Sequence, residues 1–549
     1  MAIPKLALIP SGVKAGKLYS VLPTNGDGDF TTTRNTVATR VNENGLIEEV
    51  ASNVPRLDYS DGGCPSLLLE PTSTNLIKYS EEFANVYWLK TGSSIQGDPS
   101  TEGTEEITNG DFATDSDWTK GTGWTIAGGV ASSDGTNSPL DQFSITTIGK
   151  TYKVDITVIN MTTSSVNVRL GGGSSDIIGS IESNGTYTFY GTVANSTTFR
   201  IRANTGFDGS IDNVSVKEVQ GFVSPSGTTS AFKLVEDNAN SRHRLASVAF
   251  PVTNEENYSI SVFAKYSGRP LQIFTGASAG NLYANFDLQN GTLGSKNSIS
   301  SNITSLSNGW YRCDMSFEAI STGNMDFSVI TVLAPTSAIA STYQGDGTSG
   351  VYIYGAQLEE QSYATSYIKN EGTAAGITRA ADSANGAGNA STFNDSEGVL
   401  MAEISALEDD LTFRRLTISD NSYNNTIDIL LTNNSNEIRV LVRDNTVTTS
   451  QMSYTVNSVV EFNKIAFKYK STSSSLWVNG LNVVNIADIF TLPFLTDLSF
   501  DRGDGTSNFY GNIKQIQYFD SALNDSDLET LTSWTSFTAM ANAQSYTII

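Results

Sequence analysis

Apolar and polar residues alternate along much of this sequence, which predicts antiparallel β-strands. Every second residue of 152–158 is Tyr, Val or Ile, and residues 198–202 read Thr-Phe-Arg-Ile-Arg. Since successive side chains of a strand point to opposite faces, each segment has one apolar and one polar face. Further strands are predicted at residues 258–266, 351–358 and 464–470. A single short helix is predicted near the end, where Asn524 or Asp525 can cap residues 527–531.

These strands predict an all-β fold of three antiparallel β-sandwich modules after an irregular N-terminal segment. Glycines interrupt the first 70 residues so often that this segment needs a partner surface to become ordered. A stretch rich in Gly, Ala and Asn is typical of a linker. The predicted boundaries are 1–70 for the N-terminal segment, 71–103 plus 221–382 for a host sandwich, 104–220 for a sandwich inserted into it, 383–392 for the linker, 393–537 for the third sandwich and 538–549 for a C-terminal tail.

The charge of the chain argues against nucleic acid as a partner. Its 549 residues include 33 Lys and Arg against 57 Asp and Glu, a net charge of −24, and no basic stripe interrupts this excess. No run of about 18 apolar residues is present, so no membrane insertion is expected. Pro4 and Pro10 interrupt the apolar N-terminus, and no signal peptide is expected.

Histidine and cysteine are too scarce for the common catalytic and metal sites. His243 is the only histidine, which leaves no material for a His-rich zinc site or a Ser-His-Asp triad. We expect it to face solvent from a strand. Cys64 and Cys313 lie far apart without a CxxC context, so two buried free thiols are expected rather than a disulfide.

Aromatic and acidic residues of the inserted sandwich are the candidates for carbohydrate binding. A flat aromatic face offers apolar area to a pyranose ring, and Trp118 and Tyr152 are the predicted stacking residues. Asp115 and Asp117 flank Trp118 in a loop-like stretch and complete the predicted carbohydrate-binding set. The alternative, a place in the core, stays open for Trp118 and is favoured for Trp124.

Two acidic loops have oxygen ligands spaced for calcium. Asp27 and Asp29 lie in one loop, and Asp501 and Asp504 lie in the other. Neither matches an EF-hand loop, which supplies more ligands and a terminal Glu. A structural calcium ion and a plain solvated turn are the two alternatives, and no other cofactor is expected.

Three stretches carry a resemblance to a known family: residues 5–23, residues 55–83 with their Leu-Leu-Leu-Glu-Pro-Thr-Ser-Thr-Asn, and residues 354–382 with their Tyr-Gly-Ala-Gln-Leu-Glu. They resemble fibre and appendage proteins of tailed bacteriophages. The last two bracket the host sandwich like the start and end of one module. The resemblance implies a virion fibre, commonly a homotrimer, whose residues 1–70 attach it to other virion proteins.

The two other predicted sandwiches also resemble known modules. Asn-Gly-Asp-Phe at 109–112 and Asp-Asn-Val-Ser-Val at 212–216 resemble the ends of carbohydrate-binding jelly rolls. Leu-Trp-Val-Asn-Gly at 476–480 and residues 509–519 resemble laminin-G or concanavalin-type sandwiches. These resemblances imply jelly-roll and concanavalin-like folds that recognise sugars.

A catalytic alternative rests on Glu403 and Glu408. Their segment resembles the paired-glutamate strand of concanavalin-fold glycosidases, but Ser405 replaces the middle Asp of that pattern. A retaining hydrolase needs two carboxyls about 5–5.5 Å apart on one face. Residues five apart on a regular strand point to opposite faces unless a bulge intervenes, so we expect no enzyme.

The expected function is multivalent, non-enzymatic adhesion of a bacteriophage tail or head fibre to glycans on the host surface. Weak sites on repeated copies gain avidity when they bind together. Such a protein would be assembled in the host cytoplasm and exposed on the virion. Two alternatives stay open, a capsule polysaccharide depolymerase and a purely architectural spacer of the virion.

Overall fold

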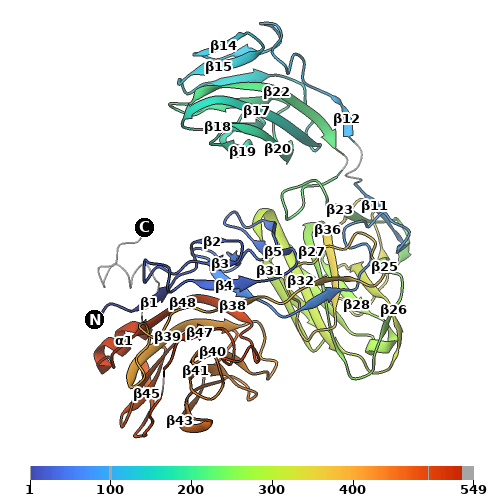
Figure 1. Cartoon of the computed structure of the whole chain (residues 1–549). Coiled ribbons are helices and arrows are strands. Elements are labelled where there is room, and N and C mark those ends of the chain that lie inside the picture. Colours follow the sequence, from blue (N-terminus) through green and yellow to red (C-terminus); the bar gives the residue numbers. More distant parts are fainter. Residues whose placement is uncertain (1, 98–101, 220, 493, 534–549) are drawn as a thin grey trace. The chain divides into compact units, whose positions relative to one another are not determined.

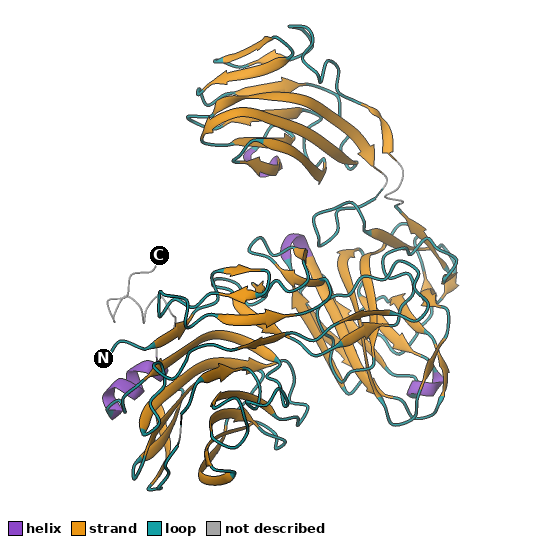
Figure 2. Ribbon diagram, in the orientation of Figure 1, coloured by secondary structure: helices purple, strands orange, loops and turns teal. Residues whose placement is uncertain are grey.

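The computed structural model describes residues 2–97, 102–219, 221–492 and 494–533, and strands dominate it (Figure 1, Figure 2). The predicted all-β, antiparallel sandwich fold is confirmed. Within these ranges the helical segments are α1 (Asp525–Ser533), η1 (Ser174–Asp176), η2 (Ala277–Ala279) and η3 (Ser307–Gly309). The predicted cap of α1 is confirmed, because Asn524 Oδ1 accepts a hydrogen bond from the Asp527 N–H at 2.9 Å. No helix of the described part is long and apolar enough to cross a membrane.

The chain divides into two compact units, of which unit 1 comprises residues 1–75, 359–368 and 376–549. Its larger sheet has eight strands, in the order β46 (Leu481–Ile486), β45 (Ser474–Val478), β44 (Asn463–Lys470), β39 (Glu397–Ala406), β48 (Gly511–Phe519), β8 (Ser66–Leu69) and β7 (Arg56–Asp58), with β1 (Leu6–Leu8) paired to β48. Its second sheet has five strands, in the order β43 (Val447–Thr455), β42 (Glu437–Asp444), β41 (Thr426–Leu431), β40 (Arg414–Ser419) and β47 (Asp497–Ser499). Buried residues of both sheets form one core, and α1 covers a smaller apolar cluster around Trp477.

The N-terminal segment is ordered because unit 1 supplies its partner surface. Strands β1 and β8 both pair with β48, and Leu6, Leu8 and Leu67 are fully buried in the common core. Smaller sheets complete this region: β2 (Val13–Lys14), β3 (Lys17–Leu18), β4 (Phe30–Thr33) and β38 (Ser383–Asn385); β5 (Ala38–Val41) and β6 (Ile47–Val50); β9 (Ser73–Asn75) and β37 (Ile377–Arg379).

The predicted linker differs from the structure in one respect. Its residues 383–385 form β38, which pairs with β4, and Ala384 and Ala387 are fully buried. The small side chains that predict a linker therefore fill close-packed core positions. The remaining domain boundaries stay a prediction, and the predicted tail 538–549 lies outside the described residues.

Unit 2 comprises residues 76–358 and 369–375. Two of its sheets have six strands each and share a core. The first contains, in order, β10 (Trp88–Thr91), β25 (His243–Ser247), β34 (Phe327–Thr331), β28 (Leu271–Thr275), β29 (Tyr283–Asp287) and β30 (Thr292–Lys296). The second contains, in order, β11 (Ser93–Gln96), β23 (Phe232–Glu236), β36 (Gly350–Glu359), β27 (Asn257–Ser267), β32 (Trp310–Glu318) and β31 (Ser300–Ser305). Two short pairs flank them, β24 (Asn240–Ser241) with β35 (Tyr343–Gln344) and β26 (Phe250–Val252) with β33 (Gly323–Met325).

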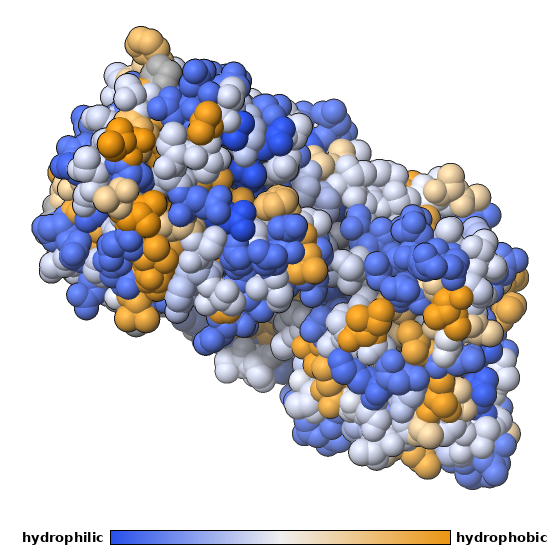
Figure 3. Space-filling view, turned by 90° about the horizontal axis from the view of Figure 1, so that it is seen from below, coloured by the Kyte–Doolittle hydropathy of each residue, from blue (hydrophilic) through white to orange (hydrophobic). Residues whose placement is uncertain are grey.

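The inserted sandwich, residues 102–219, has a core of its own. Its first sheet contains β14 (Trp124–Ala127), β15 (Val130–Asp134), β22 (Asp208–Val219), β17 (Thr151–Thr163) and β20 (Gly185–Thr192), with β12 (Glu102–Glu105) paired to β22. Its second sheet contains β13 (Thr119–Lys120), β16 (Pro139–Gln142), β21 (Phe199–Ala203), β18 (Val166–Leu170) and β19 (Ile177–Ile181). The alternation of β17 is confirmed, since Val154, Ile156 and Val158 are fully buried. On the face of the molecule drawn in Figure 3, apolar residues are interspersed with polar ones.

Candidate functional site

One face of the second sheet of the inserted sandwich carries three arginines on two neighbouring strands. On β21, Phe199 and Ile201 are fully buried in the core, so Arg200 and Arg202 point to the opposite face. The same alternation on β18 places Arg169 on that face. We call this surface the arginine face, and it consists of Asp141, Asn167, Arg169, Arg200 and Arg202.

The first row of the arginine face joins Arg169, Arg200 and Asp141. Arg200 lies directly opposite Arg169 on β18 and directly opposite Asp141 on β16. Its Nε and Nη2 donate hydrogen bonds to the two carboxylate oxygens of Asp141, at 2.7 and 2.8 Å. This planar, two-pronged pairing is the geometry in which a guanidinium holds a carboxylate best.

The second row joins Asn167, Arg202 and Pro139. Arg202 is half-buried and lies directly opposite Asn167 on β18 and Pro139 on β16. Asn167 Nδ2 donates to Asn204 Oδ1 at 3.1 Å, and Ser180, opposite Asn167 on β19, is exposed. In the part of the chain that the structure describes, no carboxylate oxygen lies within 4.0 Å of the Arg202 guanidinium.

Positive charges on this face repel one another. The pKa of Arg169 is lowered first by burial and then by the charges of Arg202 and Arg200, while Asp176 opposes the shift. The pKa of Arg200 is raised, chiefly by its hydrogen bond to Asp141 and against the effect of burial. Arg169 and Arg200 lie directly opposite each other, and like charges in such positions destabilise a sheet, so this row needs the negative partner that Asp141 supplies.

A glycine-rich loop fixes the first row. The carbonyl oxygen of Gly172 accepts a hydrogen bond from Arg200 Nη1 at 2.7 Å, and that of Gly173 accepts one from Arg169 Nη1 at 2.9 Å. The Gly173 N–H donates to Asp176 Oδ2 at 2.7 Å, which closes the loop on itself. Two guanidiniums are therefore held in place by carbonyl oxygens, while Arg202 lies in the other row.

The arginine face has the chemistry of a binding surface. A guanidinium offers five N–H donors in one plane and stays protonated at any physiological pH, so it binds hydroxyl or anionic groups but does not act as a base. The carboxylate of Asp141 is engaged by Arg200 on both oxygens. These groups can orient a ligand without transferring a proton to or from it.

The two rings predicted to stack on sugars lie in the core of the same sandwich. The Trp118 side chain is 7% exposed, and its Nε1 donates to the carbonyl oxygen of Asn109 at 3.0 Å. Tyr152 is 1% exposed, and its hydroxyl accepts a hydrogen bond from the Thr147 N–H at 2.9 Å. Neither ring presents a free face, because the core uses its apolar area. The core position favoured for Trp124 is confirmed at 4% exposure.

The two aspartates predicted beside Trp118 lie on the surface. Asp115 pairs with Lys120, Oδ1 to Nζ, at 2.5 Å. Asp117 Oδ2 accepts a hydrogen bond from the Ser116 hydroxyl at 2.6 Å, and its backbone has a φ of 69°. Neither residue belongs to the arginine face, and a role for them in carbohydrate binding stays a prediction.

The four aspartates predicted as calcium ligands bind protein groups. Asp29 pairs with Lys17 at 2.8 Å, and Asp504 pairs at 2.6 Å with the arginine two residues before it. The Asp27 carboxylate accepts a hydrogen bond from Asn25 Nδ2 at 2.7 Å, and Asp501 accepts hydrogen bonds from Asn385 Nδ2 and from the Gly503 N–H. Among the described residues, no three His, Cys, Asp or Glu side chains are grouped so that they could hold a metal ion. Calcium binding at these loops stays a prediction.

The two glutamates of the catalytic alternative occupy different environments. Glu403 lies on β39, where its Oε2 accepts a hydrogen bond from Gln515 Nε2 at 2.7 Å. The pairing of β39 with β48 shifts register directly after Glu403, which is the kind of irregularity that the catalytic alternative needed. Glu408 lies beyond the end of β39, and burial raises its pKa. These observations leave the absence of catalysis a prediction.

His243 is buried rather than solvent-facing, so that expectation is wrong. Its ring is 0% exposed, and Nε2 lies 3.2 Å from the carbonyl oxygen of Tyr343. Burial is tolerated because a backbone carbonyl oxygen can accept the hydrogen bond of the ring N–H. Both cysteines are free, as expected, but only Cys313 is buried and Cys64 is exposed.

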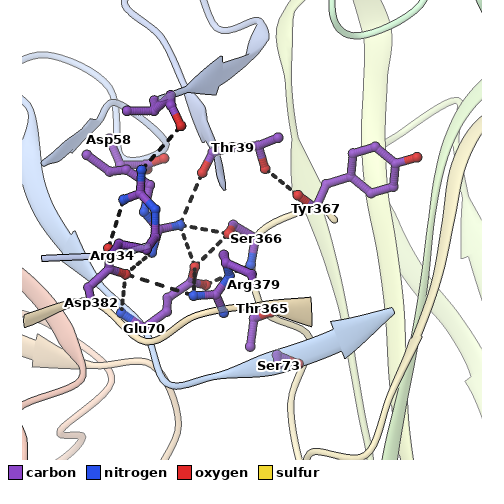
Figure 4. A network of polar contacts seen from close by, with 12 residues as sticks. Arg34, Thr39, Asp58, Glu70, Ser73, Thr365, Ser366, Tyr367, Arg379 and Asp382 are labelled. Carbon is purple, nitrogen blue, oxygen red and sulfur yellow. Dashed lines mark hydrogen bonds and ion pairs between the residues drawn. The ribbon is translucent and has the colours of Figure 1, made fainter. Parts of the chain in front are cut away.

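A second group of three arginines lies inside unit 1. The buried network consists of Arg34, Arg56, Glu70, Arg379 and Asp382, and Figure 4 shows how its side chains converge. Arg56 Nη1 pairs with Glu70 Oε2 at 2.5 Å, and Arg34 Nη1 pairs with Asp382 Oδ1 at 2.9 Å. None of these side chains is more than 5% exposed, and their ion pairs link segments of unit 1 that lie far apart in the sequence.

The pattern Thr-Phe-Arg-Ile-Arg was the sequence signal for this site. It places Arg200 and Arg202 on the polar face of one strand, whereas the predicted sugar-binding groups include the aromatic rings of Trp118 and Tyr152. Arg169 carried no such signal, because its place opposite Arg200 depends on the register between β18 and β21. That register joins residues about thirty positions apart and cannot be read from either strand alone.

Comparisons with known proteins identify no family for this chain. No family model matches the sequence, and no curated protein matches it. Among solved structures, the Ruminococcus gnavus IT-sialidase CBM40 bound to alpha2,3 sialyllactose is 14% identical, with a TM-score of 0.23 over 27% of this chain and 87% of that one. Domain 4 of a GH43 arabinanase from Geobacillus stearothermophilus, in complex with arabinotriose, is 11% identical, with a TM-score of 0.23, and the match covers 28% of this chain and 73% of that one. Trypanosoma rangeli sialidase is 9% identical, with a TM-score of 0.24, and the match covers 94% of this chain and 99% of that one. At these scores the likeness decides neither fold nor ligand.

Proposed function

We propose that this chain is a non-enzymatic glycan-binding protein and that the arginine face is its binding surface. The observation that carries the proposal is the convergence of three guanidiniums on one sheet face of a chain with a net charge of −24. The N–H groups of Arg202 match the hydroxyl and ring oxygens of a sugar, which accept hydrogen bonds. Pro139, half-buried beside Arg202, adds apolar surface against which a sugar ring can lie.

Binding at such a face is weak for one copy and strong for many. An open sheet face buries little of a ligand, so each site contributes a modest free energy of binding. Several copies on one particle raise the avidity by orders of magnitude when their spacing lets them bind together. A surface covered with repeating glycans provides the many neighbouring ligands that such avidity requires.

We further propose, from the sequence resemblance, that the protein is a homotrimeric fibre on a bacteriophage virion. Because residues 1–70 contribute strands to unit 1, contact with other virion proteins would use the outer surface of this segment rather than a separate arm. Light scattering of the purified chain tests the assembly: a trimer has three times the 58.8 kDa of one chain. A monomer at micromolar concentration would reject the trimer.

The glycan-binding proposal is tested with the full chain coupled to beads and a panel of bacterial surface polysaccharides. We expect retention of at least one polymer, loss of that retention in Arg202→Ala, and no change in polymer length. Arg439→Ala is the matched control, since Arg439 lies on a sheet face of unit 1 and pairs with Glu437 at 2.6 Å. Retention of no glycan at all would reject the proposal, and shortened polymer would replace it with the depolymerase alternative.

A further inference from the structure

We propose that the arginine face recognises a carboxylate-bearing sugar and that Arg202 is the residue that binds the carboxylate. This inference rests on the proposed function and names the class of its ligand. It starts from a difference between the three guanidiniums. Arg200 holds Asp141 with two hydrogen bonds and Arg169 donates one to the carbonyl oxygen of Gly173, whereas Arg202 has no carboxylate within 4.0 Å among the described residues.

The inferred partner is a negative charge, because Arg202 lies on the same face as Arg200 and Arg169 and has no carboxylate within 4.0 Å among the described residues. The charge of Arg202 is the largest contribution to the lowered pKa of Arg169 after burial. A neutral sugar would satisfy N–H donors but leave this repulsion in place. An anion beside Arg202 removes it, and the gain is larger at a half-buried position than in bulk water. The chain has 57 acidic side chains, yet none in the described part pairs with Arg202.

A carboxylate fits the geometry better than a free-standing charge of another kind. The face already contains one guanidinium–carboxylate pair with both prongs formed, at 2.7 and 2.8 Å. Arg202 extends from the same strand, two residues further along, and its partners across the strands are the amide of Asn167 and the ring of Pro139. A sugar that places its carboxylate on Arg202 can therefore set a hydroxyl against Asn167 and a ring face against Pro139.

The site is restricted to the second row. Carbonyl oxygens of the loop bind Arg169 and Arg200 at 2.9 and 2.7 Å and keep these guanidiniums engaged. Arg169 is 8% exposed, so a ligand reaches it mainly through its charge. Arg202, Asn167 and Ser180 are the half-buried or exposed groups of the neighbouring row. Arg169 is thus a positioning residue, and Arg202 is the contact.

The test compares each acidic polysaccharide with its own carboxyl-reduced form. The probes are polygalacturonate, hyaluronan and polysialic acid, with dextran sulfate as the sulfated arm, and binding of the full chain is measured by biolayer interferometry. We expect affinity for at least one carboxylated polymer to fall about 10- to 100-fold on carboxyl reduction, the range for losing a charge-assisted hydrogen-bond pair. We expect a similar loss in Arg202→Gln, a smaller loss in Arg202→Lys, which keeps the charge without the fork, and none in Arg439→Gln.

The outcomes separate this inference from the function on which it rests. Equal binding of native and carboxyl-reduced polymers, or of neutral glycans with unchanged affinity in Arg202→Gln, overturns the inference and leaves glycan binding standing. Preference for dextran sulfate over every carboxylated polymer overturns the proposal that the group bound by Arg202 is a carboxylate. Binding to no glycan of either panel rejects both. Circular dichroism of Arg202→Gln and Arg202→Lys shows whether a loss of binding occurs in folded protein.

Discussion

The arginine face and the buried network contain the same charged groups in different surroundings. Each has three arginines and two nearby carboxylates, Asp141 and Asp176 at the face and Glu70 and Asp382 in the network. In the network Glu70 pairs with two arginines and Asp382 with three, and the side chains are at most 5% exposed. At the face Asp141 serves one arginine, whose side chain is 19% exposed.

This difference teaches that the kinds of residue present do not separate a structural charge cluster from a binding surface. What separates them is how deeply the side chains are buried and how many arginines pair with each carboxylate. A buried ion is tolerated only when fixed partners replace its water, and Arg34 and Arg56 obtain them from carboxylates and from backbone carbonyl oxygens. A half-buried guanidinium keeps part of its water and can exchange it for a ligand. The following predictions test that distinction, in order of decreasing effect.

Removing a shared carboxylate from the network has the largest expected effect. Asp382→Ala leaves Arg34 and Arg56 buried without this partner, so we expect the free energy of unfolding of unit 1 to fall by about 3–5 kcal/mol. Urea denaturation, followed by hydrogen exchange in peptides that cover residues 56–70, measures it. A loss below about 1 kcal/mol would show that the network is no more structural than the face.

Acid weakens the network through Glu70. Burial alone would raise its pKa, but Arg379, Arg56 and Ser366 lower it from 4.5 to about 2. A carboxylate with a depressed pKa stabilises the folded state above its unfolded pKa, and that stabilisation is lost as pH falls through the folded pKa. We expect on the order of 3 kcal/mol to be lost between about pH 4.5 and pH 2.

The control for the acid prediction is Glu70→Gln, which is less stable at neutral pH but has no carboxyl to titrate at this position. Its urea midpoint should fall less steeply with pH over the same window. Parallel pH profiles of the two proteins would assign the acid sensitivity to other carboxylates.

Removing the carboxylate that pairs with Arg200 has an intermediate expected effect on stability. Asp141→Asn removes a charged partner that is 3% exposed, and we expect a loss of about 1–2 kcal/mol, since Arg200 keeps its bond to Gly172 and part of its water. The same substitution adds a free cation to the face, so retention of acidic polymers should rise. Thermal melts and binding to carboxylated polymers are the two measurements, and weaker binding in folded protein would contradict the repulsion argument.

Local pattern predicted the strands well and their partners poorly. Residues 464–470 were predicted as a strand and lie in β44 (Asn463–Lys470), because alternation is a property of a few neighbouring residues. The pairing of β1 with β48 joins Leu6 to Tyr518, and nothing in either segment specifies the other. The sequence predicts that the N-terminal segment needs a partner surface, but not that strand β48 of the same chain provides it.

Only part of the candidate site could be predicted from the sequence. Alternation in 198–202 placed two arginines on one face, but their function depends on what lies opposite, and only the register with β16 and β18 reveals that. Trp118 is predicted to bind sugar because an exposed tryptophan ring can stack on a sugar ring. A large apolar ring beside a sandwich core contributes more free energy of folding when it is buried, and Trp118 is 7% exposed. Charge imbalance between neighbouring strands was the stronger signal, and it requires the pairing to be known.

The smallest effect on stability is expected for substitution of Arg202, the proposed ligand contact. Arg202→Gln removes no ion pair found in the described residues and relieves repulsion on Arg169, so stability should change by less than about 0.5 kcal/mol in either direction. Urea denaturation measures it beside Arg34→Gln, where the network loses a guanidinium that is 1% exposed and pairs with Asp382 at 2.9 Å. If the two substitutions destabilise the protein equally, Arg202 is a structural residue and the contrast between face and network fails. A nearly silent Arg202→Gln with lost binding would instead mean that this charge is kept for a partner outside the chain.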